Sequence, residues 1–177
     1  MFISNLTGFH EEAVIVYDHG ASKALGRDYW RVLNDFSFIV EELEGYVYIP
    51  RGYLSDGASV PRIFWNVIPP WGRYGQAVIV HDYLCENLML DGYDGVKVHI
   101  TRKQADEILD AAMKELAVTP ITRKMIMFGV STYRRLFKPT KPVILPLKIE
   151  LQENFDITEW NGLKEAVKDI VESYNKH

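Results

Sequence analysis

The sequence predicts an α+β fold in which an N-terminal antiparallel β meander packs against three or four helices. Three observations support this prediction. Short β-branched and aromatic runs fill the first third of the chain, helical periodicity replaces them after Pro61, and a proline-rich segment precedes a last amphipathic stretch. The chain has 177 residues, of which 47% are hydrophobic and 12% aromatic, which is enough material for a globular core.

Four short strands are expected before the first helix. They are predicted over residues 12–17, 29–33, 36–41 and 46–49. Each run is rich in β-branched or aromatic residues, and polar turn residues separate the runs. Short strands joined by short polar turns are typical of an antiparallel meander.

The middle of the chain predicts helices. They are expected from Pro61 to before Pro69, then over 73–88, 101–116 and 119–137, with 89–100 as a loop or small hairpin. Thr101 and Gln104 have the spacing of a capping box, and Thr119-Pro120 has the pattern of an N-cap followed by a first-turn proline. The helix over 73–88 is apolar nearly all round, so we expect it to be buried.

The C-terminal part looks like an addition to the main body. Residues 138–148 contain three prolines and predict an extended linker, and 158–175 predict an amphipathic helix. We therefore expect a single α+β domain over 1–137, a linker over 138–148 and a helical appendage over 149–177. The appendage either packs back on the body or docks on a partner.

Composition excludes several classes of function. The net charge is −4 and the pI about 5.7, so no basic surface for nucleic acid is expected. The single cysteine, Cys85, excludes an intramolecular disulfide and fits a reducing compartment. The N-terminus lacks the pattern of a signal peptide, and no apolar run approaches the roughly 20 residues that span a bilayer. We expect neither a nucleic-acid nor a membrane partner.

Residues 52–84 gather the chemically most interesting side chains. His81 lies in the middle of an apolar helix face, where it is either a structural histidine or a neutral group ready to accept a proton or bind a metal. Asp82 follows it but points about 100° away, so the two do not share a ligand from one helix face.

Two further carboxylates have both a structural and a functional interpretation. Asp56, in Asp-Gly, suits a turn, but together with Ser59 it also crowds a helix start, where an anion or a capping carboxylate binds. Asp106 lies at the border of a buried helix face and is expected to pair with a cation or reach toward His81. The candidate cations are Arg62, Arg73 and Arg123.

Three motifs in this region are SDGASVPR, HDYL and ADEILDAAM. They resemble the phage- and prophage-associated family of unknown function catalogued as DUF1353, over about residues 46–136, with Ser55 where threonine is common. The resemblance implies a phage or prophage origin, hence location in a virion or the host cytoplasm. It also implies that Asp56, His81, Asp82 and Asp106 converge. It supplies no activity.

Two functions follow, and the residues favour neither. In a metal-dependent hydrolase, one divalent metal would be held by Asp56, His81 and Asp106, or by Asp82 in place of Asp106. A variant uses Ser59 as nucleophile and His81 as base, although Ser59 lacks the G-x-S-x-G elbow.

The alternative is a non-catalytic virion component, of the tail or of assembly. The polar cluster is then a buried hydrogen-bond network that fixes packing. Residues 138–177 dock on another phage protein. A host-directed inhibitor would also fit a small acidic chain, but no residue points to it specifically.

Overall fold

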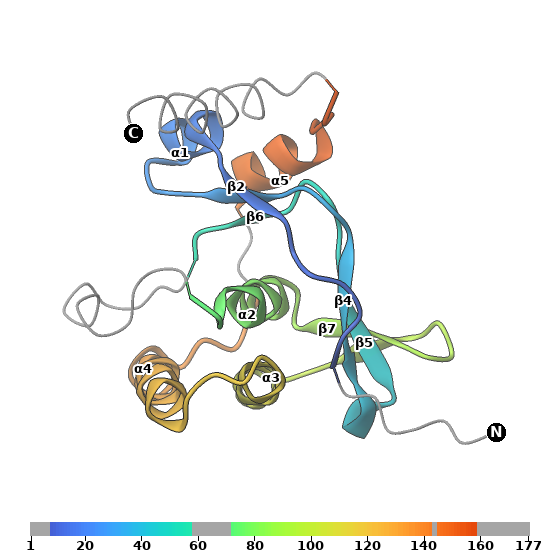
Figure 1. Ribbon diagram of the computed structural model, residues 1–177, viewed down its shortest axis with the longest axis vertical. Helices are drawn as coiled ribbons and strands as arrows, with labels where there is room; N and C mark the ends of the chain where they lie inside the picture. The colour runs from blue at the N-terminus through green and yellow to red at the C-terminus, as the bar shows by residue number, and fades with distance from the viewer. Residues whose placement is uncertain (1–7, 58–71, 143–144, 159–177) are drawn as a thin grey trace, which may run out of the picture. The chain divides into compact units, whose positions relative to one another are not determined.

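The computed structural model describes residues 8–57, 72–142 and 145–158 of the chain. The chain forms two compact units. Unit 1 comprises residues 1–12, 36–49 and 57–144, and unit 2 comprises 13–35, 50–56 and 145–177. Antiparallel sheets and α-helices, labelled in Figure 1, confirm the predicted α+β class.

Unit 1 contains a five-stranded sheet whose paired neighbours are all antiparallel, in the order β1-β4-β5-β7-β8. Its strands are β1 (Gly8–Phe9), β4 (Phe36–Val40), β5 (Gly45–Ile49), β7 (Met89–Gly92) and β8 (Lys97–His99), with a short 3-10 turn, η1 (Glu41–Leu43), between β4 and β5. Phe38 lies opposite Val47, and both are fully buried. The pair β7–β8 is the small hairpin that was one of the two expectations for residues 89–100.

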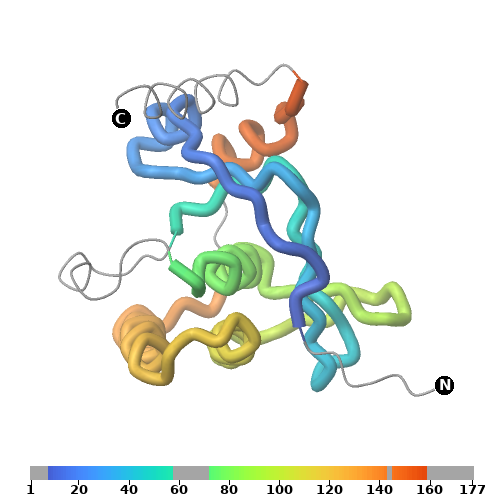
Figure 2. Tube along the Cα trace, in the orientation of Figure 1, coloured from blue at the N-terminus to red at the C-terminus, as the bar shows by residue number. Residues whose placement is uncertain are grey.

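Three helices complete the described part of unit 1. They are α2 (Gly75–Asn87), α3 (Arg102–Glu115) and α4 (Pro120–Phe137). The predicted capping box of Thr101 and Gln104 is present at the start of α3, and Thr119 caps α4 with Pro120 in its first turn. α3 packs against both α2 and α4, as the tube in Figure 2 shows. α2 contacts β5 and α3 contacts β1, so the helices form a layer on the sheet.

The described residues of unit 2 combine a three-stranded antiparallel sheet, in the order β2-β3-β6, with two short helices. Its elements are β2 (Ile15–Tyr17), α1 (His19–Leu25), β3 (Trp30–Val32), β6 (Leu54–Ser55) and α5 (Pro146–Glu153). Helix α1, where only a turn was expected, is capped at one end by the Asp18 side chain. Gly26 ends it in the left-handed conformation, with φ of 74°.

The strands expected as one meander belong to two different sheets. β3 pairs with β2 on one edge and with β6 on the other, so neither edge is available to β4. β4 instead pairs with β1 and β5. The meander is interrupted because β6, which lies beyond the expected strands, occupies the second edge of β3.

The proline-rich linker is partly helical, contrary to expectation. α5 begins at Pro146, because a proline in the first helical turn needs no hydrogen-bond acceptor for its nitrogen. Lys148, on α5, is buried, with its ammonium 4.4 Å from the centre of the Tyr53 ring. The helices predicted after Pro61 and over 158–175 lie almost entirely outside the described residues. The predicted division at residues 137 and 148 stays a prediction.

Candidate functional site

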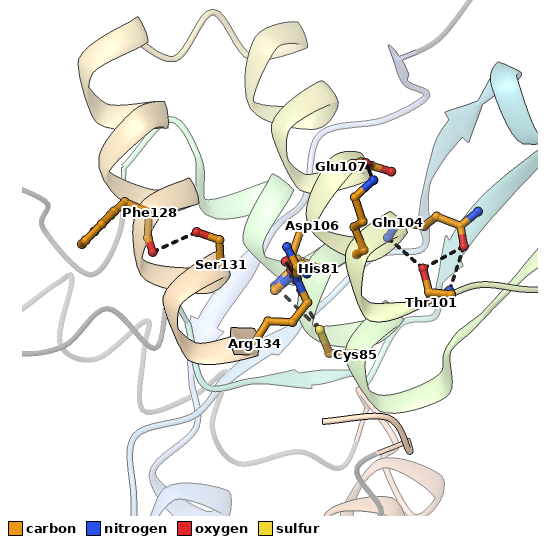
Figure 3. Close-up of polar contacts among 10 residues, drawn as sticks. His81, Cys85, Thr101, Gln104, Asp106, Glu107, Phe128, Ser131 and Arg134 are labelled. Carbon is orange, nitrogen blue, oxygen red and sulfur yellow. Dashed lines mark hydrogen bonds and ion pairs between the residues drawn. The ribbon is translucent and has the colours of Figure 1, made fainter. Parts of the chain in front are cut away.

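Asp106 joins three helices of unit 1. Its side chain extends from α3 and is almost completely buried, with 5% of the residue exposed. One carboxylate oxygen, Oδ1, lies 3.0 Å from Nε2 of His81 on α2. The other, Oδ2, accepts a hydrogen bond of 2.7 Å from Nε of Arg134 on α4. Figure 3 shows the three side chains converging, and we call them the Asp106 centre.

The helix pattern explains why a carboxylate reaches this position. Ala105 and Leu109, on either side of Asp106 along the buried stripe of α3, are almost completely buried. One turn further on, Asp110 makes a similar connection to α4, where Arg123 donates to both of its oxygens at 2.8 to 3.0 Å. Two ion pairs therefore fix α4 against α3.

His81 is positively charged at neutral pH. Burial by itself lowers the pKa of the imidazole, but the hydrogen bonds with Asp106 and Cys85, helped by the nearby charge of Asp82, raise it to about 10. Packing against Asp106 thus favours the charged imidazole over the neutral one that was one of the two interpretations of His81. Burial also raises the pKa of Asp106, yet bonding to His81 and Arg134 outweighs burial and lowers that pKa.

Two residues that contact His81 or Asp106 were not predicted from the sequence. Cys85 lies one turn after His81 on α2, and its Sγ is 3.5 Å from His81 Nε2. The i, i+4 spacing of the two residues is the signal that finds it. Arg134 was not among the cations considered for Asp106, because 28 residues separate the two and no local pattern connects them. Arg123, which was considered, pairs with Asp110 instead.

The other predicted site residues have separate positions. Asp82 follows His81 on α2 and is half-buried. Asp56 belongs to unit 2, where its Oδ2 is 2.8 Å from NH1 of Arg27. Ser59 lies outside the described residues. The structure thus brings His81 and Asp106 together, while the convergence of Asp56 with them stays a prediction.

The Asp106 centre is an unfavourable place for a metal ion. Among the described residues, no three His, Cys, Asp or Glu side chains are grouped so that they could hold one. His81 and Asp106 offer two ligands, but a metal would have to displace the imidazole proton that Asp106 stabilises. It would also approach the guanidinium of Arg134, which already pairs with Asp106.

Comparison with known proteins identifies the family. The family described as "Protein of unknown function (DUF1353)" matches residues 30–130. This chain belongs to the DUF1353 family. The DUF1353 match includes Asp56, His81 and Asp106 but ends before Arg134. In the part of the chain that is described, no helix is long and apolar enough to cross a membrane.

One relative that matches part of this chain is a longer protein. The uncharacterized protein y4jT of Sinorhizobium fredii (strain NBRC 101917 / NGR234) is 37% identical over 71 residues, which are 38% of this chain and 20% of that protein. The chain thus matches about a fifth of that relative's length. No solved structure matches. Membership in DUF1353 therefore supplies the family but no activity.

Proposed function

We propose that this chain is a non-catalytic component of a bacteriophage or prophage assembly, and that its helical layer binds a partner protein. The observation that carries the proposal is the outer face of α4. Of the 18 residues of this helix, all of which are described, only Ile126 is fully buried. Five large hydrophobic side chains are between 57% and 73% exposed, and we call them the α4 surface: Ile121, Phe128, Tyr133, Leu136 and Phe137.

An exposed group of this kind is costly unless it is covered. Apolar side chains that gather on one element, rather than being scattered singly, mark interaction surfaces in soluble proteins. In Figure 3 the Phe128 ring points away from the Asp106 centre. Tyr133 and Phe137 stack on one another at the end of the helix, with ring centroids 4.8 Å apart. The α4 surface is therefore suited to contact another protein.

The Asp106 centre serves this function structurally. Arg134 and Arg123 extend from α4 toward α3 and pair there with Asp106 and Asp110. A fully bonded buried network fixes one packing arrangement, because each alternative leaves a charge unpaired. The network thereby sets the rotation of α4. That residues 138–177 supply a second contact with another phage protein stays a prediction of this proposal.

A hydrolase is the second candidate. The observation that favours it is the environment of His81. This histidine is hydrogen-bonded to the Asp106 carboxylate, lies beside the Cys85 thiol, and has a side chain that is 13% exposed. In the metal-dependent form, Asp56 would join His81 and Asp106, and Ser59 is the alternative nucleophile. Titration calorimetry with zinc and manganese tests this form. Binding at micromolar concentrations that is lost in folded His81→Ala supports the hydrolase, and no binding removes the metal-dependent form.

Co-sedimentation with phage particles tests the proposed function. The tagged chain is produced in its source organism during prophage induction, and the particles are purified. The wild-type chain is expected to sediment with them, and Phe128→Ser/Leu136→Ser is expected to stay in the supernatant. The matched control is Tyr93→Ser/Val96→Ser, which alters two exposed hydrophobic residues of the β7–β8 hairpin. Absence of all three from the particles, or equal sedimentation of all three, contradicts the proposal.

A further inference from the structure

We infer that the α4 surface receives an acidic amphipathic helix of another protein, whose carboxylates pair with Lys124 and Arg135. The inference rests on the proposed function and specifies the chemistry of its partner. The apolar residues of α4 indicate the shape of the partner, and the basic residues of α4 indicate its charge.

Three of the five residues of the α4 surface form a narrow stripe, and Tyr133 and Phe137 lie to one side of it. At about 100° per residue, Ile121, Phe128 and Leu136 fall within an arc of about 80°, with Met125 inside it. At about 1.5 Å per residue, the stripe is about 22 Å long. A stripe of this width and length matches three to four turns of a second helix, with anchors spaced i, i+4, i+7 and i+15.

All the charged residues of α4 are basic. No Asp or Glu occurs anywhere between residues 116 and 148, although the whole chain carries a net charge of −4. Lys124 and Arg135 are both exposed and lie about three turns apart along one edge of the stripe, within about 40° of Phe128. The other two arginines of the helix, Arg123 and Arg134, pair with aspartates of α3. The stripe therefore has one basic edge.

This charge pattern decides between the possible occupants. A second copy of α4 brings no carboxylate that could pair with Lys124 and Arg135. An anionic lipid surface attracts helices with a broad apolar face and basic residues on the polar side, whereas here the side opposite the stripe packs on α3. A helix with Asp or Glu along one edge of its own apolar stripe complements both features. The apolar residues of such a helix supply affinity, and its acidic residues set its orientation and make the binding specific.

Two synthetic helical peptides of about 20 residues test the inference. They share one leucine stripe and differ only along one edge, which carries glutamates in the first and lysines in the second. Fluorescence anisotropy measures their binding to the full chain. The glutamate peptide is expected to bind saturably and at least about tenfold more tightly than the lysine peptide. Phe128→Ser/Leu136→Ser weakens it at least about tenfold, while Tyr93→Ser/Val96→Ser leaves it unchanged.

Charge reversal provides the sharpest variant. Lys124→Glu/Arg135→Glu keeps the apolar stripe and is expected to invert the preference, so that the lysine peptide binds more tightly. Equal binding of the two peptides to the wild-type chain overturns the inference. So does sedimentation with vesicles of equal parts phosphatidylcholine and phosphatidylglycerol that depends on Phe128 and Leu136. Self-association of the wild-type chain that Phe128→Ser/Leu136→Ser abolishes also overturns it.

The two proposals fail in different ways. If co-sedimentation with particles requires Phe128 and Leu136 but the two peptides bind equally, the assembly function stands and the acidic helix does not. If the peptides are discriminated as expected but the chain is absent from particles, the partner chemistry stands and the assembly function does not.

Discussion

In the described part of each unit, one aspartate is buried and paired with a cation, and the two sites differ in what surrounds them. In unit 2, Asp18 is 3% exposed, caps α1 through Oδ1 and is 2.6 Å from Nε of Arg31 through Oδ2. In unit 1, Asp106 is 5% exposed and binds His81 and Arg134 through its two oxygens. Both carboxylates use both oxygens within their own unit.

The partners of the two aspartates set them apart. Arg31 also donates to the backbone carbonyls of Gly52 and Leu151, and the Phe155 ring lies 4.5 Å from its guanidinium. The Asp106 centre contains an imidazole that titrates. The Asp106 centre thus resembles a catalytic site because one of its cations is a histidine. The packing role of the aspartate is the same in both units.

The largest effect is expected at the more deeply buried pair. Arg31→Met removes the charge that compensates Asp18 and two donors to backbone carbonyls, so it lowers the free energy of unfolding by about 3–5 kcal/mol. Urea unfolding measures this loss. Arg27→Met is the matched control in the same unit, because Arg27 pairs with Asp56 while being 54% exposed, and costs about 1 kcal/mol or less. Equal losses in the two variants would show that burial of the pair is not what matters.

A smaller loss is expected at the Asp106 centre. Asp106→Asn leaves His81 and Arg134 facing each other without a compensating charge, but the Arg134 side chain is 30% exposed and partly screened. The expected cost is about 2–3 kcal/mol in urea unfolding. Asp110→Asn, one turn away on the same helix, alters a more exposed pair and costs about 1 kcal/mol. A cost for Asp106→Asn no larger than for Asp110→Asn contradicts the structural role of the centre.

The pH dependence separates the two sites. The pKa of His81 rises from 6.5 to about 10 on folding, so its contribution is complete below about pH 6.5 and is lost as the pH rises through about 10. The pKa of Asp106 falls below its ordinary 3.8, so its contribution is present above that value and lost in acid. The stability difference between wild type and His81→Gln should therefore shrink as the pH rises from neutral to strongly alkaline values.

Urea unfolding at a series of pH values measures this change. The difference between wild type and Ile126→Ala serves as the control, because this substitution alters no ionisable group and its effect should stay constant over the same range. A His81→Gln difference that is independent of pH would mean that the imidazole is neutral in the folded chain.

The smallest effect on stability is expected at the α4 surface. Phe128→Ser/Leu136→Ser changes the free energy of unfolding by about 0.5 kcal/mol or less, because both side chains are already exposed. Ile126→Ala, on the buried face of the same helix, costs about 2 kcal/mol or more. If thermal or urea unfolding shows that the serine variant is as unstable as Ile126→Ala, the α4 surface contributes to the core of the isolated chain.

Local signals predicted much of the fold. The hydroxyl and amide at Thr101 and Gln104 act over three residues, so their capping box could be derived without the tertiary structure. Sheet membership could not be derived in this way. β3 pairs with β6, more than twenty residues later, and a short run such as Leu54–Ser55 has too few residues to show a strand pattern.

The same distinction applies to the site. The border position of Asp106 on its helix predicted pairing, and His81 was one of the partners considered. Arg134 could not be predicted, because its contact depends on how α4 packs on α3. The direction in which the pKa of His81 changes could not be derived from burial alone, because packing brings the Asp106 carboxylate to the imidazole.

Replacing the whole Asp106 centre by apolar residues tests its structural role most directly. In His81→Leu/Asp106→Leu/Arg134→Met no buried charge is left unpaired, and such replacements are often neutral or stabilising. The measurement is co-sedimentation of this folded variant with phage particles. A packing role predicts that it sediments as the wild-type chain does. A variant that is folded, with Phe128 and Leu136 intact, but absent from the particles would contradict that role and favour chemistry at the centre.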